Sequence, residues 1–173
     1  NFTSFTFNHG GAIREVGDAI IGGTYNFTWG TTYPANIQTD SVTIKDLTNN
    51  VILLSGTAND GSAVITLPTI NKSTPSSHQW RANAVRTNST VFYSPTVTVS
   101  WLWRRYYGIQ SSTSLTAAQI QGLNSELATN RLGNYTFGAG NYKYFAWPTS
   151  FGAPTLFRDF NTNLAVAMAG VDE

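Results

Sequence analysis

The chain has 173 residues and a net charge of +1, and only 11% of its residues are charged, against about 25% in an average globular protein. Ten basic and nine acidic residues, without a basic cluster, exclude a nucleic-acid partner, and no apolar run is long enough to span a membrane. Cysteine is absent, which excludes disulfides and thiol chemistry, while Thr, Asn and Ser supply almost a third of the residues.

The first hundred residues predict a series of short strands. Tyr25, Phe27 and Trp29 alternate with polar residues, and this period of two is typical of a half-buried strand. Two apolar runs, at 41–47 and 51–54, flank an Asn-rich turn and predict a hairpin. Turn residues separate these elements throughout, as in an all-β domain.

Three further alternating runs predict strands at 63–67, 78–86 and 91–103. His78 falls on the same face as Trp80, so we expect it to be packed rather than catalytic. Pro95 predicts a bulge or an edge position early in the longest strand. Seven or so short strands separated by turns predict an antiparallel, Ig-like β-sandwich over residues 1–107.

The pattern then changes to a small α+β module, expected over residues 108–173. Thr116 and Gln119 have the spacing of a capping box, which marks the start of a helix. Apolar residues recur at helical spacing at Ile120, Leu123 and Leu127. We therefore expect one helix over about 116–130, closed by Gly133. Further strands are expected at 135–137, 142–147 and 164–168. The predicted fold class is mainly β.

Residues suited to catalysis are scarce. His9 and His78 are the only histidines, and Asp40, Asp46 and Asp60 look like solvated turn or strand-end residues. No pair of acids is placed to flank a glycosidic bond, and no calcium or phosphate loop occurs. We therefore expect no enzymatic activity, no cofactor and no metal site.

Aromatic residues gather in two segments. Trp and Tyr residues surround Arg104 and Arg105, and residues 134–160 hold nine more rings. Alternation over 142–147 cannot place every ring on one face, so some must meet another layer or another chain. These rings form either a compact core or an interface toward other protomers or a glycan. The interface or glycan-stacking candidates are Trp101, Trp103, Arg105, Tyr107, Tyr142, Tyr144, Trp147 and Phe151.

Two segments resemble structural proteins of tailed bacteriophages. Residues 97–108 follow the W-x-x-R-x-Y-Y-G pattern of the strand that joins an Ig-like module to a small terminal module. Residues 142–152 resemble the Y-x-Y-x-A-x-P-x-x-[YF]-G segment of that module. The resemblance implies a non-enzymatic virion component of the tail-fibre, baseplate or capsid-decorating type. It also implies assembly in the host cytoplasm and a location on the particle surface.

The leading hypothesis is therefore a virion structural protein. Its expected partners are copies of itself, with a trimer favoured, other virion proteins, and a glycan of the host surface, but neither nucleic acid nor a membrane. The alternative is a bacterial surface or secreted carbohydrate-binding module, in which rings such as Tyr144 and Trp147 stack on sugars. A hydrolase is the third reading, disfavoured by the scarcity of acids and bases.

Overall fold

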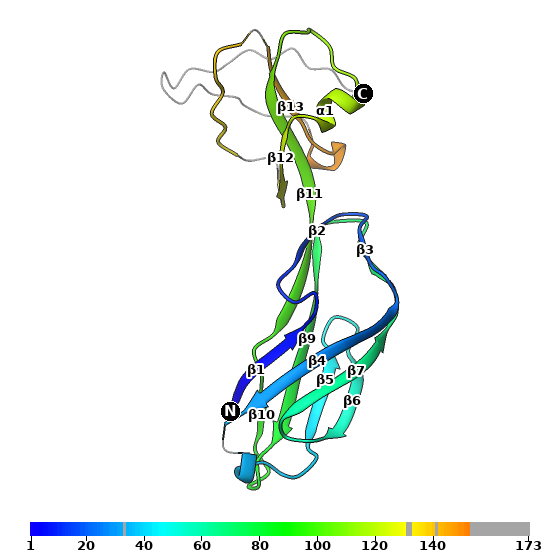
Figure 1. The fold of residues 1–173 in the computed structure, drawn as a ribbon, viewed down its shortest axis with the longest axis vertical. Helices are drawn as coiled ribbons and strands as arrows, with labels where there is room; N and C mark the ends of the chain where they lie inside the picture. Colours follow the sequence, from blue (N-terminus) through cyan, green and yellow to red (C-terminus); the bar gives the residue numbers. More distant parts are fainter. Residues whose placement is uncertain (33, 131–132, 141, 153–173) are drawn as a thin grey trace. The chain divides into compact units, whose positions relative to one another are not determined.

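The computed structural model describes residues 1–32, 34–130, 133–140 and 142–152 (Figure 1). The chain forms two compact units, residues 1–102 and 103–173, so the division precedes residue 103 rather than residue 108. Among the described residues strands far outnumber helices, and the predicted mainly β class is confirmed. The strand expected at 164–168 lies outside the described residues. So do Phe157 and Phe160, two of the nine rings counted over residues 134–160.

The first unit is built from strands and one 3-10 turn. In chain order these are β1 (Phe2–Phe7), β2 (Ile13–Glu15), β3 (Ala19–Ile20), β4 (Gly23–Thr31), η1 (Pro34–Asn36), β5 (Val42–Asp46), β6 (Val51–Thr57), β7 (Gly61–Leu67), β8 (Ile70–Asn71), β9 (Ser76–Val85), β10 (Val91–Tyr93) and β11 (Val97–Gln110), whose residues from 103 on belong to the second unit. One sheet has the order β1-β4-β7, and the other contains β11-β9-β5-β6. The predicted hairpin is β5 and β6. β2 departs from the antiparallel prediction, because it pairs with β11 in parallel.

Aromatic side chains from both sheets fill the core between them. The ring of Trp80 on β9 lies 4.9 Å from that of Phe7 on β1 and 6.5 Å from that of Phe27 on β4. Phe7 and Phe27 stack at 4.7 Å. Phe27 and Trp29 are buried as their alternation predicts, and Tyr25 packs partly against the same cluster. Full burial of one such ring contributes about 1.5–3 kcal/mol, so this cluster stabilises the sandwich.

The long strand predicted around Pro95 is divided into β10 and β11, both of which pair with β9. Six positions separate Val91 from Val97, but only five separate their partners on β9, so the predicted bulge is confirmed. Ser94 repairs the ladder there. Its N–H donates to the Ala82 carbonyl (2.9 Å), and its hydroxyl accepts from the Ala82 N–H (2.9 Å). The side chain thus replaces a backbone acceptor that the bulge displaces.

His78 is buried, as expected, but its partner was not foreseen. Nε2 of His78 is hydrogen-bonded to Oδ2 of Asp46 at 2.8 Å, and both side chains lie in the core. Asp46 also accepts hydrogen bonds from the backbone N–H (2.9 Å) and the side-chain amide (3.0 Å) of Asn49. The prediction of a solvated strand-end acid is therefore wrong for Asp46. A buried carboxylate requires such partners, and here they also fix the turn between β5 and β6.

The second unit contains α1 (Ala117–Gln121), β12 (Asn124–Ala128), β13 (Tyr142–Ala146) and η2 (Thr149–Phe151). β11 lies between β12 and β13 and is antiparallel to both. The segment expected as a strand at 135–137 is not a strand; its rings pack on this sheet instead.

The predicted helix is present but much shorter than expected. Its capping box between Thr116 and Gln119 is confirmed. The helix ends after Gln121, with Gly122 rather than Gly133 at its C-cap, and residues 124–128 form β12. Pairing with residues 124–128 satisfies backbone N–H and C=O groups of β11. If these residues continued the helix, that side of β11 would lack partners.

We predict that Asp46→Ala lowers the free energy of unfolding by about 3 kcal/mol, because three hydrogen bonds of about 1 kcal/mol each are lost. Asp18→Ala is the matched control, since Asp18 is exposed, and it should change stability by less than about 0.5 kcal/mol. Urea unfolding of the two variants and the wild type measures the difference. Equal stabilities would mean that the buried pair contributes nothing to the fold.

Candidate functional site

The sheet of the second unit sorts the predicted candidate residues onto two faces. Successive side chains of a strand point to opposite faces, so Trp103, Arg105 and Tyr107 share one face of β11. Phe145 on β13 is the direct partner of Tyr107 and lies on that same face. Tyr107 and Phe145 both make ring–ring contacts on this face, which makes it the first candidate for a site in the second unit.

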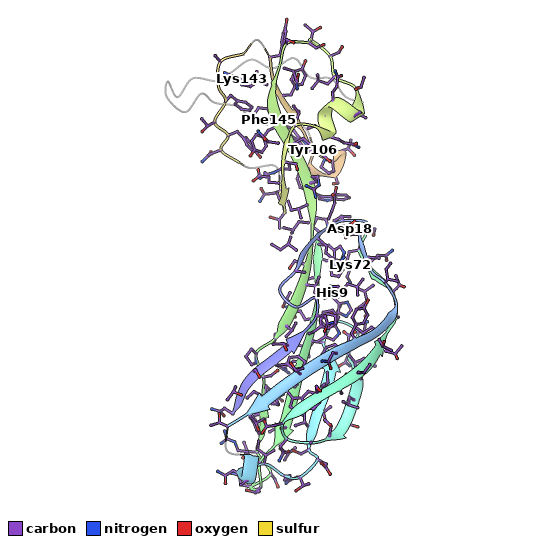
Figure 2. The ribbon with its side chains drawn as sticks, viewed as in Figure 1. His9, Asp18, Lys72, Tyr106, Lys143 and Phe145 are labelled. Carbon is purple, nitrogen blue, oxygen red and sulfur yellow. The ribbon has the colours of Figure 1, made fainter. Side chains whose placement is uncertain are left out.

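Four rings form an aromatic cluster on this face: Tyr107, Tyr135, Phe137 and Phe145. The ring of Tyr135 lies 4.4 Å from that of Tyr107 and 5.0 Å from that of Phe145. Phe137 meets Phe145 edge-on at 5.0 Å. Lys143 and Phe145 both extend from β13 (Figure 2), and the Lys143 ammonium lies 6.0 Å from the Phe137 ring. The rings therefore pack on one another within the chain.

Arg105 anchors the edge of the aromatic cluster. It is 7% exposed, and its guanidinium donates to Oε1 of Glu126 (2.7 Å) and to the Asn130 carbonyl (2.8 Å). The guanidinium also lies 5.7 Å from the Tyr135 ring. Burial raises the pKa of the Tyr135 hydroxyl to about 12, helped by its hydrogen bond to Glu126 and opposed by the positive charge of Arg105. Arg105 lies within β11 rather than at a strand end, and its guanidinium bridges this strand and the segment 126–135.

The other face of the sheet holds different candidates. Tyr142 and Tyr144 alternate with Phe145 along β13, so they point away from the aromatic cluster. The Tyr144 hydroxyl donates to the Ser112 carbonyl, and Tyr142 is 41% exposed. Gly108 on β11 is the direct partner of Tyr144, and a Cβ atom on it would come within 2.7 Å of Leu123. The segment after α1 therefore packs closely on this face.

Three candidates lie away from both groups. Trp101 belongs to the core of the first unit: it is completely buried, and its indole N–H donates to the Asp18 carbonyl at 2.7 Å. The expectation that Trp101 contacts a partner or a glycan is therefore wrong, because no part of it reaches the surface. Trp147 donates to the Gly152 carbonyl (3.1 Å) and closes the turn that contains Phe151. The eight candidates do not form one surface.

The strand β7 carries a feature that sequence reasoning missed. It pairs with β4 over seven successive positions without a register shift, and the described part of the chain supplies no strand on its other side. No residue of β1, β4 or β7 is charged. Val64, in the middle of β7, is 71% exposed. The result is a regular, uncharged, open sheet edge.

The outer face beside this edge is polar and neutral. Thr6 and Thr28 are hydrogen-bonded to each other through their hydroxyls across β1 and β4. Asn26 is the partner of Val64, and Thr66 follows two residues later on the same face of β7. The charge-free run 61–67 is visible in the sequence, but its position at the edge of a sheet depends on pairing between distant segments.

Within the described ranges, no three His, Asp or Glu side chains come together as metal ligands. No helix among these residues is long and apolar enough to cross a membrane. Comparison with known proteins finds no match to a family model, a curated protein or a solved structure.

We predict that Tyr135 titrates at about pH 12 and that Glu126→Gln lowers its pKa toward 10.0. A raised pKa means that the folded chain favours the neutral phenol. The contribution of Tyr135 to stability is therefore complete below pH 10 and is lost as the pH rises through 12. NMR of the labelled Tyr135 ring carbon measures the titration. Ser125→Ala, a change on the opposite face of β12, should leave it unaltered. Titration of Tyr135 near pH 10 in the wild type would contradict the half-buried position and the hydrogen bond to Glu126.

Proposed function

We propose that this protein is a non-enzymatic structural component of a tailed-bacteriophage particle, and that it acts by assembly with copies of itself. The resemblance of residues 97–108 and 142–152 to virion proteins supports the kind of particle. The open edge of β7 supports the mode of action, and this single feature carries the proposal.

An open edge invites another strand, because its outward N–H and C=O groups lack partners in the sheet. Monomeric β-proteins usually protect such edges with charged residues, proline or bulges. β7 has none of these over Gly61–Leu67, and Val64 adds exposed apolar surface. Pairing with a strand of another copy would satisfy the backbone groups and cover Val64 in one step.

A trimer requires a contact between two different surfaces, because only a heterologous contact closes a ring of three. β1 is the opposite edge of the same sheet, and its pairing with β4 is regular from Ser4 to Phe7. We therefore place β7 of one copy against β1 of the next. The net charge of +1 for each chain opposes this packing only weakly.

We predict that the wild-type chain has a solution mass of three times 18.8 kDa and that the double variant Val64→Lys/Thr66→Lys is a monomer. Two ammonium groups at the edge would be brought against an uncharged strand, which disfavours pairing. Sedimentation equilibrium measures the masses. Val91→Lys is the matched control, because Val91 is also an exposed apolar strand residue (44%) but belongs to the other sheet.

The control should remain a trimer, and all three proteins should unfold at similar temperatures. A monomeric wild type at its highest soluble concentration would contradict the proposal. Retention of the trimer in a folded double variant would show that copies meet elsewhere.

A further inference from the structure

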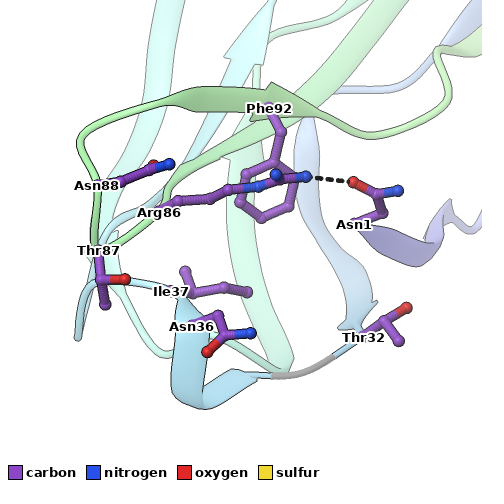
Figure 3. Close-up of a pocket in the computed structure, with 8 residues that line it drawn as sticks. All are labelled: Asn1, Thr32, Asn36, Ile37, Arg86, Thr87, Asn88 and Phe92. Atoms are coloured by element: carbon purple, nitrogen blue, oxygen red, sulfur yellow. Dashed lines mark hydrogen bonds between the residues drawn. The ribbon is translucent and has the colours of Figure 1, made fainter.

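A hollow of about 400 Å³ opens in the first unit between the start of β1, η1 and the turn that joins β9 to β10 (Figure 3). Its volume is within the range of sites for small ligands. We call it the Arg86 pocket, after its one charged residue. Its other walls include Asn1, Asn36, Thr87, Asn88 and Phe92.

Backbone hydrogen bonds hold the walls of the Arg86 pocket in place. The Thr87 N–H donates to the Asn36 carbonyl (3.0 Å) and joins the turn to η1. The Ser89 N–H donates to the Arg86 carbonyl (2.8 Å), and the Arg86 N–H donates to the Thr90 carbonyl (2.9 Å). The walls are thus largely formed before any ligand arrives, which lowers the entropy lost on binding.

Arg86 presents a cation that no carboxylate among the described residues neutralises. Its guanidinium donates to Oδ1 of Asn1 (2.8 Å), the dashed line in Figure 3. It also lies 5.4 Å from the centroid of the Phe92 ring. Within the part of the chain that the structure describes, no carboxylate forms an ion pair with it. A guanidinium has five N–H donors, and one bond to an amide oxygen leaves most of them for a ligand.

The remaining lining is neutral and suited to hydroxyl groups. Asn36, Thr87 and Asn88 are exposed at the rim, whereas Ile37 and Phe92 are buried beneath it. A side-chain amide carries both donors and an acceptor, as a sugar hydroxyl requires. The Asn88 oxygen already accepts from the Thr90 N–H (3.1 Å), so Asn88 contributes mainly its NH2 donors. The combination of a neutral amide rim, an apolar base and one guanidinium fits a sugar that bears a negative charge.

We propose that the Arg86 pocket binds a carboxylate-bearing sugar unit of a surface polysaccharide. The carboxylate pairs with Arg86, and the ring hydroxyls bond to the amides of Asn36 and Asn88. An Arg–carboxylate pair is a strong, directional, charge-assisted contact. This inference concerns recognition rather than assembly, and it does not depend on pairing along β7, because β7 contributes no residue to the pocket.

The test is NMR titration of the 15N-labelled chain with D-glucuronate, and with D-glucose, acetate and D-glucose 6-phosphate as comparison probes. Glucuronate should shift the amide signals of Thr87 and Asn88 and bind more tightly than glucose or acetate. Arg86→Gln should weaken glucuronate binding by about tenfold or more. Arg81→Gln is the matched control, since Arg81 also stacks on a ring (4.0 Å from Tyr93) but lies outside the pocket, and it should stay within about twofold of the wild type.

Each other outcome counts against the proposal. If acetate binds as tightly as glucuronate, the pocket recognises an anion but not a sugar. If glucose 6-phosphate binds more tightly than glucuronate, the preferred anion is a phosphate rather than a carboxylate. If Arg86→Gln and Arg81→Gln weaken glucuronate binding equally, the effect comes from the net charge of the protein and not from the pocket. If Arg86→Gln does not fold, Asn36→Ala replaces it, because this exposed amide can be removed without touching the Asn36 carbonyl in the wall. Unchanged glucuronate affinity in that variant would overturn the proposal.

Discussion

Backbone pairing is the constraint on which this structure depends, because a chain with few charges and no cysteine must hold its sheets together through hydrogen bonds and ring packing. At the bulge after β10, the Ser94 hydroxyl replaces a displaced backbone acceptor. In the second unit β11 has a strand on each side. The sheet β1-β4-β7 is the exception, since both of its edge strands, β1 and β7, are uncharged and paired on one side only. That exception is the basis on which we propose a function in assembly.

The scarcity of charge has a structural counterpart in how charged groups are used. Asp46 is buried against His78 and is also bonded by the exposed Asn49. Arg105 is buried and pairs with the partly exposed Glu126 beside Tyr135. The sheet β1-β4-β7 carries no charge at all. Arg86 differs from these groups because its charge faces an open pocket. Assembly through a neutral sheet and recognition through a single cation are therefore compatible on one molecule.

The strands of the first unit could be predicted because period-two alternation is a local signal, and Phe27, Trp29 and Trp80 point inward as that signal requires. The helix was overextended because Leu123 and Leu127 also fit a helical stripe. What decides there is non-local: residues 124–128 pair with β11, and Glu126 meets Arg105. The same limit applies to Trp101. Its alternation places it on one face of a strand, but only the packed structure shows that this face lies in the core of the first unit.

The aromatic cluster of the second unit could be predicted from the sequence only in part. The rings near residues 107 and 145 could be named from composition, yet their packing on one another follows from strand register.

Hydrogen exchange of the β7 amides at increasing protein concentration tests the assembly claim most directly. Slower exchange along β7 and β1 at high concentration, with β10 unchanged, is the predicted result. Exchange along β7 that is equally fast at every concentration would contradict it.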